Sequence, residues 1–175
     1  MTEFDGLVLT GGSARRLGGV DKPSLVVGDR SMVGRAVDAL RDARRVIVIG
    51  PGGDVIEDPP GGGPVAAIAA GLALVRAPVV AILAADLPFV TSPTVDVLVA
   101  SAPAVAVDDR GREQYLLAAY PTEVLRSALP VVPHGARLSD VVAALRPHRV
   151  QLSGFPPPWW DCDTDQELEQ ARAWA

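Results

Sequence analysis

Three short apolar runs, each ending at a loop rich in glycine or aspartate, place the strongest limit on the fold of this chain. They cover residues 6–9, 46–49 and 79–85. Their length and their flanking loops predict strands that are buried on both faces of a sheet. Helical patterns separate them: one over residues 31–40, capped by Ser31, and one from Pro64 to about Val75. This alternation predicts βαβ units and a mostly parallel sheet.

The second half of the chain continues in the same style. Apolar patterns predict strands over residues 104–107 and 115–120 and helices over 121–128 and 138–145. The sequence Thr164-Asp165-Gln166-Glu167 has the form of a capping box and predicts a last helix to about Trp174. The expected fold class is α/β: one domain over residues 1–175, three-layered and Rossmann-like.

Composition excludes several classes of function. A net charge of −5 leaves no basic surplus for a general nucleic-acid binder. The single cysteine, Cys162, excludes an intramolecular disulfide and a cysteine-based zinc site. No apolar run approaches the roughly 18 residues of a membrane span, and no secretory signal opens the chain. We therefore expect a cytoplasmic protein without a membrane partner.

The predicted strands end at three polar loops. The first carries Gly11 and Gly12, the second spans residues 50–53, and the third begins at Asp86. Ligands of parallel α/β sheets bind outside the carboxyl ends of the strands, so all three loops are expected at one binding edge.

The loop after the first strand has the character of a phosphate-binding segment. Of sixteen basic residues all but one are arginine, and the single lysine, Lys22, closes this glycine-punctuated segment. Glycines let successive backbone N–H groups face an anion, and a compact ammonium suits phosphate oxygens. The spacing matches neither a Walker loop nor a dinucleotide fingerprint, because Lys22 lies between Asp21 and Pro23.

The pattern Leu-Thr-Gly-Gly-x3-Arg-Leu-Gly-x2-Asp-Lys-Pro resembles the signature of the MobA-like nucleotidyltransferases. The resemblance spans nearly the whole chain. It continues past this loop in four segments, 55–58 with 63–67, 85–89, 135–137 and 160–168, and is strong over the first 90 residues as a whole.

The resemblance implies a reaction and a set of site residues. The reaction is transfer of GMP from GTP to the phosphate of molybdopterin, with release of pyrophosphate. Lys22, with help from Arg16, would stabilise the charge on the pyrophosphate. Asp86 would hold Mg²⁺ together with substrate phosphates. The remaining nucleotide-binding positions that it implies are Leu9, Thr10, Gly11, Gly12, Asp58, Gly63 and Pro64.

Three departures from the family pattern keep alternatives open. Ala67 replaces a glycine near the expected base site, Gly50 stands where an asparagine is frequent, and Asp161 and Asp163 replace two asparagines. A cytidylyltransferase or a sugar-phosphate nucleotidyltransferase is the alternative within enzymes. A non-catalytic nucleotide-binding protein that docks to molybdoenzyme maturation proteins is the alternative outside them.

Overall fold

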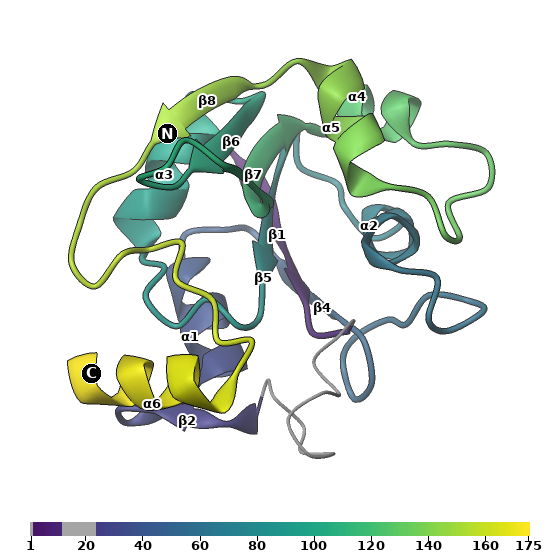
Figure 1. The fold of residues 1–175 in the computed structure, drawn as a ribbon. Helices are drawn as coiled ribbons and strands as arrows, with labels where there is room; N and C mark the ends of the chain where they lie inside the picture. Colours follow the sequence, from purple (N-terminus) through teal and green to yellow (C-terminus); the bar gives the residue numbers. More distant parts are fainter. Residues whose placement is uncertain (1, 12–23) are drawn as a thin grey trace.

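The computed structural model describes residues 2–11 and 24–175. Strands and helices follow one another along the chain, and we use the labels of Figure 1 for them. The strands are β1 (Phe4–Leu9), β2 (Val26–Val27), β3 (Arg30–Ser31), β4 (Val46–Ile49), β5 (Val79–Ala84), β6 (Ala104–Val107), β7 (Glu113–Pro121) and β8 (His148–Gln151). The helices are α1 (Met32–Ala39), α2 (Pro64–Leu72), α3 (Ser92–Ala100), α4 (Thr122–Ala128), α5 (Leu138–Leu145) and α6 (Asp165–Trp174).

Six strands form the central sheet in the order β4-β1-β5-β7-β6-β8. β1 pairs in parallel with β4 and β5, and β6 pairs in parallel with β8. β7 is antiparallel to both of its neighbours, β5 and β6. Every strand of this sheet except β7 therefore runs in one direction, which confirms the predicted α/β fold with a mostly parallel sheet.

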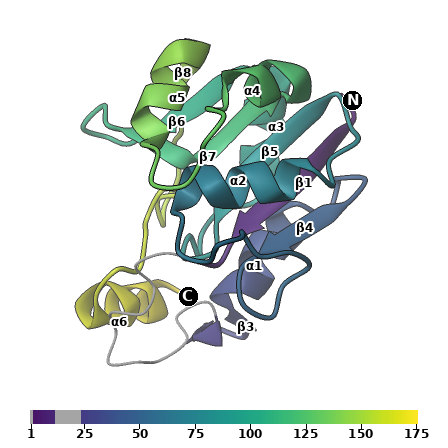
Figure 2. The same cartoon turned by 90° about the vertical axis from the view of Figure 1, so that its right-hand side faces the viewer.

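Helices cover both faces of the sheet, which gives three layers (Figures 1 and 2). One apolar cluster joins the sheet to α1 and α3, and a second joins its other face to α2, α4 and α5. β1 shows the alternation: Phe4 and Val8 belong to the first cluster, whereas Leu7 and Leu9 belong to the second. A third, smaller cluster joins α6 to the β2–β3 hairpin.

Close packing of α2 on the sheet depends on a glycine. A Cβ atom added to Gly71 would lie 2.5 Å from Cδ1 of Ile49 and 3.1 Å from Cδ2 of Leu7. Because Gly71 has no side chain, α2 lies directly against β1 and β4. The helix start at Pro64 therefore has a fixed place relative to the ends of these strands.

Four elements are absent from the sequence-based expectation: the short strands β2 and β3, the helix α3 and the strand β8. α3 has Pro93 in its first turn, and Val95, Leu98 and Val99 are buried at helical spacing. The β-branched residues of this segment have an intrinsic preference for strands. It is nevertheless a helix, because as a helix it packs its apolar side chains against the sheet. β8 is an exposed edge strand whose sequence, His-Arg-Val-Gln, lacks an apolar pattern, so only its pairing with β6 defines it.

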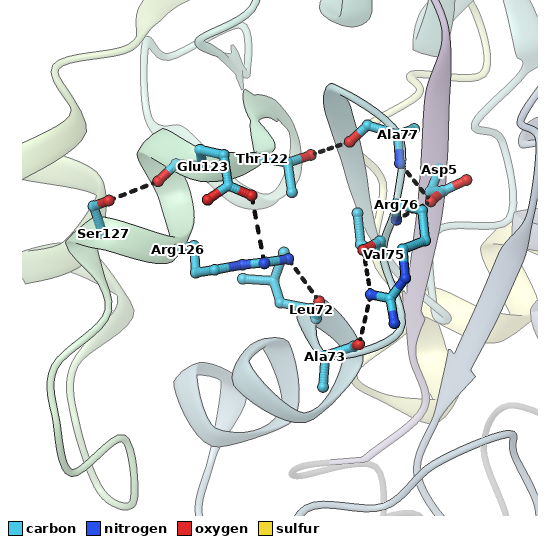
Figure 3. Close-up of polar contacts among 10 residues, drawn as sticks. All are labelled: Asp5, Leu72, Ala73, Val75, Arg76, Ala77, Thr122, Glu123, Arg126 and Ser127. Atoms are coloured by element: carbon cyan, nitrogen blue, oxygen red, sulfur yellow. Dashed lines mark hydrogen bonds and ion pairs between the residues drawn. The ribbon is translucent and has the colours of Figure 1, made fainter.

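Asp5 is a buried carboxylate with a structural role (Figure 3). Its Oδ2 accepts hydrogen bonds from the backbone N–H groups of Arg76 and Ala77, at 2.7 and 3.0 Å. The hydroxyl of Thr122 donates to the carbonyl of Ala77 at 2.7 Å, and Arg126 donates to the carbonyl of Leu72 at 3.0 Å. These bonds join β1, the α2–β5 connection and α4 at the end of the sheet opposite the predicted site.

Candidate functional site

The ends of β1, β4 and β5 meet at one edge of the sheet, as the sequence predicts. The backbone N–H of Thr10 donates to the carbonyl of Ile49 at 2.9 Å, which joins the end of β1 to that of β4. The N–H of Ala85 donates to the carbonyl of Leu9 at 3.0 Å, which joins the end of β5 to that of β1. The start of the Gly-rich segment, the loop at Gly50 and the loop at Asp86 are thus neighbours.

Thr10 and Gly50 are in direct contact at this edge. The hydroxyl of Thr10 donates to the carbonyl of Ile49 at 2.9 Å. Gly50 has φ +132°, and a Cβ atom there would approach Oγ1 of Thr10 to less than 3.0 Å and the N atom of Gly11 to 3.2 Å. Only glycine satisfies both the backbone angle and the space. The structure therefore explains Gly50 by close backbone approach, a role that the sequence pattern alone does not reveal.

Asp86 is half-buried and lies in a turn directly after β5. Its backbone carbonyl accepts a hydrogen bond from the N–H of Cys162 at 3.2 Å, so the segment with Asp161 and Asp163 lies beside it. The predicted capping box of α6 holds this segment. Glu167 Oε2 accepts from the N–H groups of Asp163 and Thr164, at 2.9 and 2.7 Å, and the Thr164 hydroxyl accepts from the N–H of Glu167 at 3.2 Å.

The start of α2 lies at the same edge, because α2 leads from the end of β4 back to the start of β5. Gly63, with φ +85°, is its N-cap residue and Pro64 its first helical residue. Next to them, the N–H of Gly135 donates to the carbonyl of Gly62 at 2.8 Å. This bond to Gly62 brings the resemblance-based segment 135–137 next to the start of segment 63–67, although more than 60 residues separate them in the sequence.

The outcome differs for the other predicted residues. Asp58 is exposed on the loop between β4 and α2 and makes no hydrogen bond or ion pair within the described part of the chain. Gly12, Arg16 and Lys22 lie outside the described residues. Ala67 is 7% exposed and packs in the cluster between α2 and the sheet, so its methyl group adds to the core.

Asp108, at the end of β6, is an acidic residue at this edge that sequence reasoning missed. Its pKa lies below the usual 3.8, chiefly because its carboxylate accepts a hydrogen bond from the backbone N–H of Arg112. Its Oδ1 accepts at 2.8 Å from Arg112 and at 2.9 Å from the N–H of Arg110. Because these hydrogen bonds close the turn before β7, the Asp108 carboxylate stabilises the fold and is not assigned to a ligand.

The carboxylates near β5 determine which metal would suit the site. Among the described residues, no three His, Cys, Asp or Glu side chains form a metal-binding group. This excludes an all-protein cage from that part of the chain. Mg²⁺ is instead commonly held by one or two carboxylates together with waters and substrate phosphates. Asp86, with Asp161 and Asp163 beside it, fits this kind of donor set.

The fold and this edge define the class of protein: an α/β protein with the start of a Gly-rich segment and a carboxylate at adjacent strand ends. The family model described as the MobA-like NTP transferase domain matches residues 6–150, and the chain belongs to this family. Within the described residues, no helix has the length and apolar character needed to cross a bilayer.

Known relatives show how far the likeness extends. A molybdenum cofactor guanylyltransferase from Bradyrhizobium sp. (strain ORS 278) is 37% identical over 41% of this chain and 39% of its own length. The chain thus matches about two fifths of that relative.

Solved structures share the fold. Rv0371c from Mycobacterium tuberculosis H37Rv is 21% identical, with a TM-score of 0.75 over 99% of this chain and 100% of its own. That protein has also been solved in complex with manganese. The 2-C-methyl-D-erythritol 4-phosphate cytidylyltransferase of Thermus thermophilus is 22% identical, with a TM-score of 0.68 over 98% of each chain.

Proposed function

We propose that this nucleotidyltransferase transfers GMP from GTP to the phosphate of molybdopterin and releases pyrophosphate. The observation that carries the proposal is the meeting of the loop at Thr10, the turn at Asp86 and the start of α2 at one edge. The name of the Bradyrhizobium relative supports guanylyl transfer in particular. Burial of Ala67 adds support, because its methyl group packs in the core between α2 and the sheet.

The proposed chemistry needs positioning and charge neutralisation rather than a general base. The acceptor is a phosphate monoester, which is already anionic at neutral pH. One of its oxygens attacks the α-phosphorus of GTP, the bond from that phosphorus to the bridging oxygen breaks, and pyrophosphate leaves. Such in-line transfer is accelerated by alignment of the two reactants and by cations near the transferred group.

Each residue has a defined place in this proposal. The backbone groups of residues 9–12 contact the nucleotide, and Lys22 with Arg16 neutralises the pyrophosphate. Asp58, Gly63 and Pro64 lie on the nucleoside side. Asp86 binds Mg²⁺, with Asp161 or Asp163 as a second carboxylate. When bound, Mg²⁺ would supply charge neutralisation on the phosphates.

A cytidylyltransferase is the second candidate function. The base-side change at Gly50 keeps it open, and Asp161 and Asp163, in place of the family's asparagines, favour a different acceptor. The cytidylyltransferase of Thermus thermophilus also shows that this fold serves a sugar-alcohol phosphate acceptor.

Calorimetric titration with GTP, CTP, UTP and ATP, with and without Mg²⁺, tests the nucleotide. Selective, Mg²⁺-strengthened binding of GTP supports the proposal. Selective binding of CTP overturns it in favour of the second candidate, and no binding leaves a docking protein as the better explanation.

Release of pyrophosphate in the presence of molybdopterin then tests the acceptor. Asp86→Asn should abolish the Mg²⁺ effect on GTP binding and the release of pyrophosphate. Asp96→Asn is the matched control, since Asp96 is an exposed carboxylate on α3. Equal activity of both variants would remove Asp86 from the site.

A further inference from the structure

The structure contains a pocket whose lining does not include the loops at Thr10, Gly50 and Gly63. It has a volume of about 290 Å³ and lies between α1, the start of α3 and the segment over residues 153–158 that leads from β8 to α6. In Figure 1 this segment passes along the left side of the molecule. Arg35, Thr91, Thr94 and Ser153 are the polar side chains of its lining, and Phe89 and Phe155 are the aromatic ones.

We propose that this pocket binds a small organic anion: a single planar ring or a body of similar size that carries a carboxylate or a phosphate. The inference does not depend on the proposed reaction. It rests on the charge, the hydroxyl groups, the apolar walls and the volume of the pocket.

Arg35 provides the positive charge, and its position is fixed. Its Nε donates to the carbonyl of Val27 at 2.7 Å, and Nη2 lies 3.4 Å from Oδ1 of Asp29. Asp29 is 89% exposed, so water screens this ion pair strongly. The guanidinium has five N–H donors, and Nη1 has no partner within the described residues. An anion in the pocket would use these remaining donors without displacing the bond to Val27.

No other charged residue lines the pocket within the described part of the chain. The protein as a whole is acidic, with a net charge of −5, so a lining with one cation and no carboxylate is a local exception. In a partly enclosed space such a cation favours an anionic ligand more strongly than it would in open water.

Two hydroxyl groups add hydrogen-bonding capacity. Oγ1 of Thr91 lies 3.1 Å from Oγ1 of Thr94, and only one hydroxyl can donate in that bond. The other keeps its proton for a ligand. Thr91 is the N-cap residue of α3, yet its side chain makes no capping bond to the helix. The Thr91 hydroxyl therefore bonds to Thr94 and does not cap α3.

The apolar walls favour a ligand in which a flat apolar ring is attached to the anionic group. Phe155 is 78% exposed, although its ring rests edge-on against Trp174 at a centroid distance of 5.1 Å. Trp174 also contacts the ring of Phe89 at 6.0 Å. The pocket thus has aromatic rings and prolines on its walls, and the exposed ring at its rim is supported from behind.

The volume limits the size of the ligand. Pockets for drug-sized ligands begin at about 300 Å³, so 290 Å³ suits one ring with one charged group and is too small to enclose a nucleoside triphosphate. Pro88 and Phe89 of the lining follow Asp86 by two and three residues. A bound anion would therefore contact the segment that carries the predicted metal ligand.

The test measures binding of phenyl phosphate to the full chain by calorimetry, with inorganic phosphate and benzyl alcohol as matched probes. We expect saturable binding of one phenyl phosphate per chain and at least tenfold weaker binding of the other two. Arg35→Gln should weaken binding of phenyl phosphate at least tenfold, and Thr94→Val several-fold. Arg41→Gln is the control, because Arg41 is exposed, pairs with Asp42 at 3.7 Å and does not line the pocket.

Several outcomes would overturn the proposal. Equal affinity for benzyl alcohol would mean that the pocket binds apolar groups without using the charge of Arg35. Equal affinity for inorganic phosphate would mean that it binds anions without using its apolar walls. Competition by GTP, or loss of binding in Lys22→Ala, would place the probe at the nucleotide edge instead. If Arg35→Gln unfolds through loss of its bond to Val27, undiminished binding by a folded Thr94→Val variant still contradicts the proposal.

Discussion

Replacement of Gly50 by alanine tests whether the contact between the β1 and β4 loops shapes the nucleotide edge. The new methyl group would meet the hydroxyl of Thr10 at less than 3.0 Å and would stand on a backbone with φ +132°. Thr10 would have to turn away and lose its hydrogen bond to the carbonyl of Ile49. The start of the Gly-rich segment would then move.

The expected loss of stability combines two effects. A non-glycine residue in a sparsely populated region of φ costs about 1–3 kcal/mol. Loss of the Thr10 hydrogen bond adds about 1 kcal/mol. We therefore expect Gly50→Ala to lower the free energy of unfolding by about 3 kcal/mol. Gly52→Ala is the matched control: φ is +78° there, and a Cβ atom would meet nothing within 4 Å. Its expected cost is about 1 kcal/mol.

Urea unfolding of four proteins measures the contact itself: the parent, Gly50→Ala, Thr10→Ala and the double variant. Because Thr10→Ala removes the hydroxyl that the new methyl group meets, the double variant should be more stable than the sum of the single effects predicts, by about 1 kcal/mol. GTP titration of Gly50→Ala and of the control Gly52→Ala should show weaker binding for Gly50→Ala. Equal losses for these two variants, together with an additive double variant, would refute the reasoning.

Further predictions concern a buried carboxylate, a pH effect and the single lysine. Asp5→Ala should lower the free energy of unfolding by roughly 3 kcal/mol, since two backbone N–H groups lose their acceptor; a loss below about 0.5 kcal/mol in urea unfolding, the usual range for surface changes, would contradict this. The folded-state pKa of Asp108 is lowered, so its contribution to stability is complete above 3.8 and disappears as the pH falls below 3.8 through the folded-state pKa. Thermal unfolding of Asp108→Asn should accordingly lose part of the acid dependence of Tm seen in the parent. Lys22→Arg keeps the charge but should reduce the rate of pyrophosphate release by about tenfold to a hundredfold, because a planar guanidinium replaces a compact ammonium; an unchanged rate would remove Lys22 from the reaction.

Local signals in the sequence were sufficient to predict the framework of the protein. Residues 46–49, 104–107 and 138–145 form elements with the predicted bounds, because apolar periodicity directly reports which side chains must be buried. The caps at Ser31 and Thr164 were also predictable, since a side-chain oxygen three residues before a helical N–H acts locally. The family follows from motifs that resemble those of known nucleotidyltransferases. That the three strand ends meet at one edge follows from the parallel sheet, because motifs after parallel strands lie at one end of it.

Packing between distant segments set the features that no local signal predicts. Residues 148–151 form the strand β8 because they pair with β6. The α3 segment is helical because Val95, Leu98 and Val99 pack on the sheet. Similarly, the contact of Gly50 with Thr10 joins positions 40 residues apart, and the pocket at Arg35 combines three separate segments. Local sequence signals carry no information about such contacts, since they are set by how the layers pack and where the connections cross.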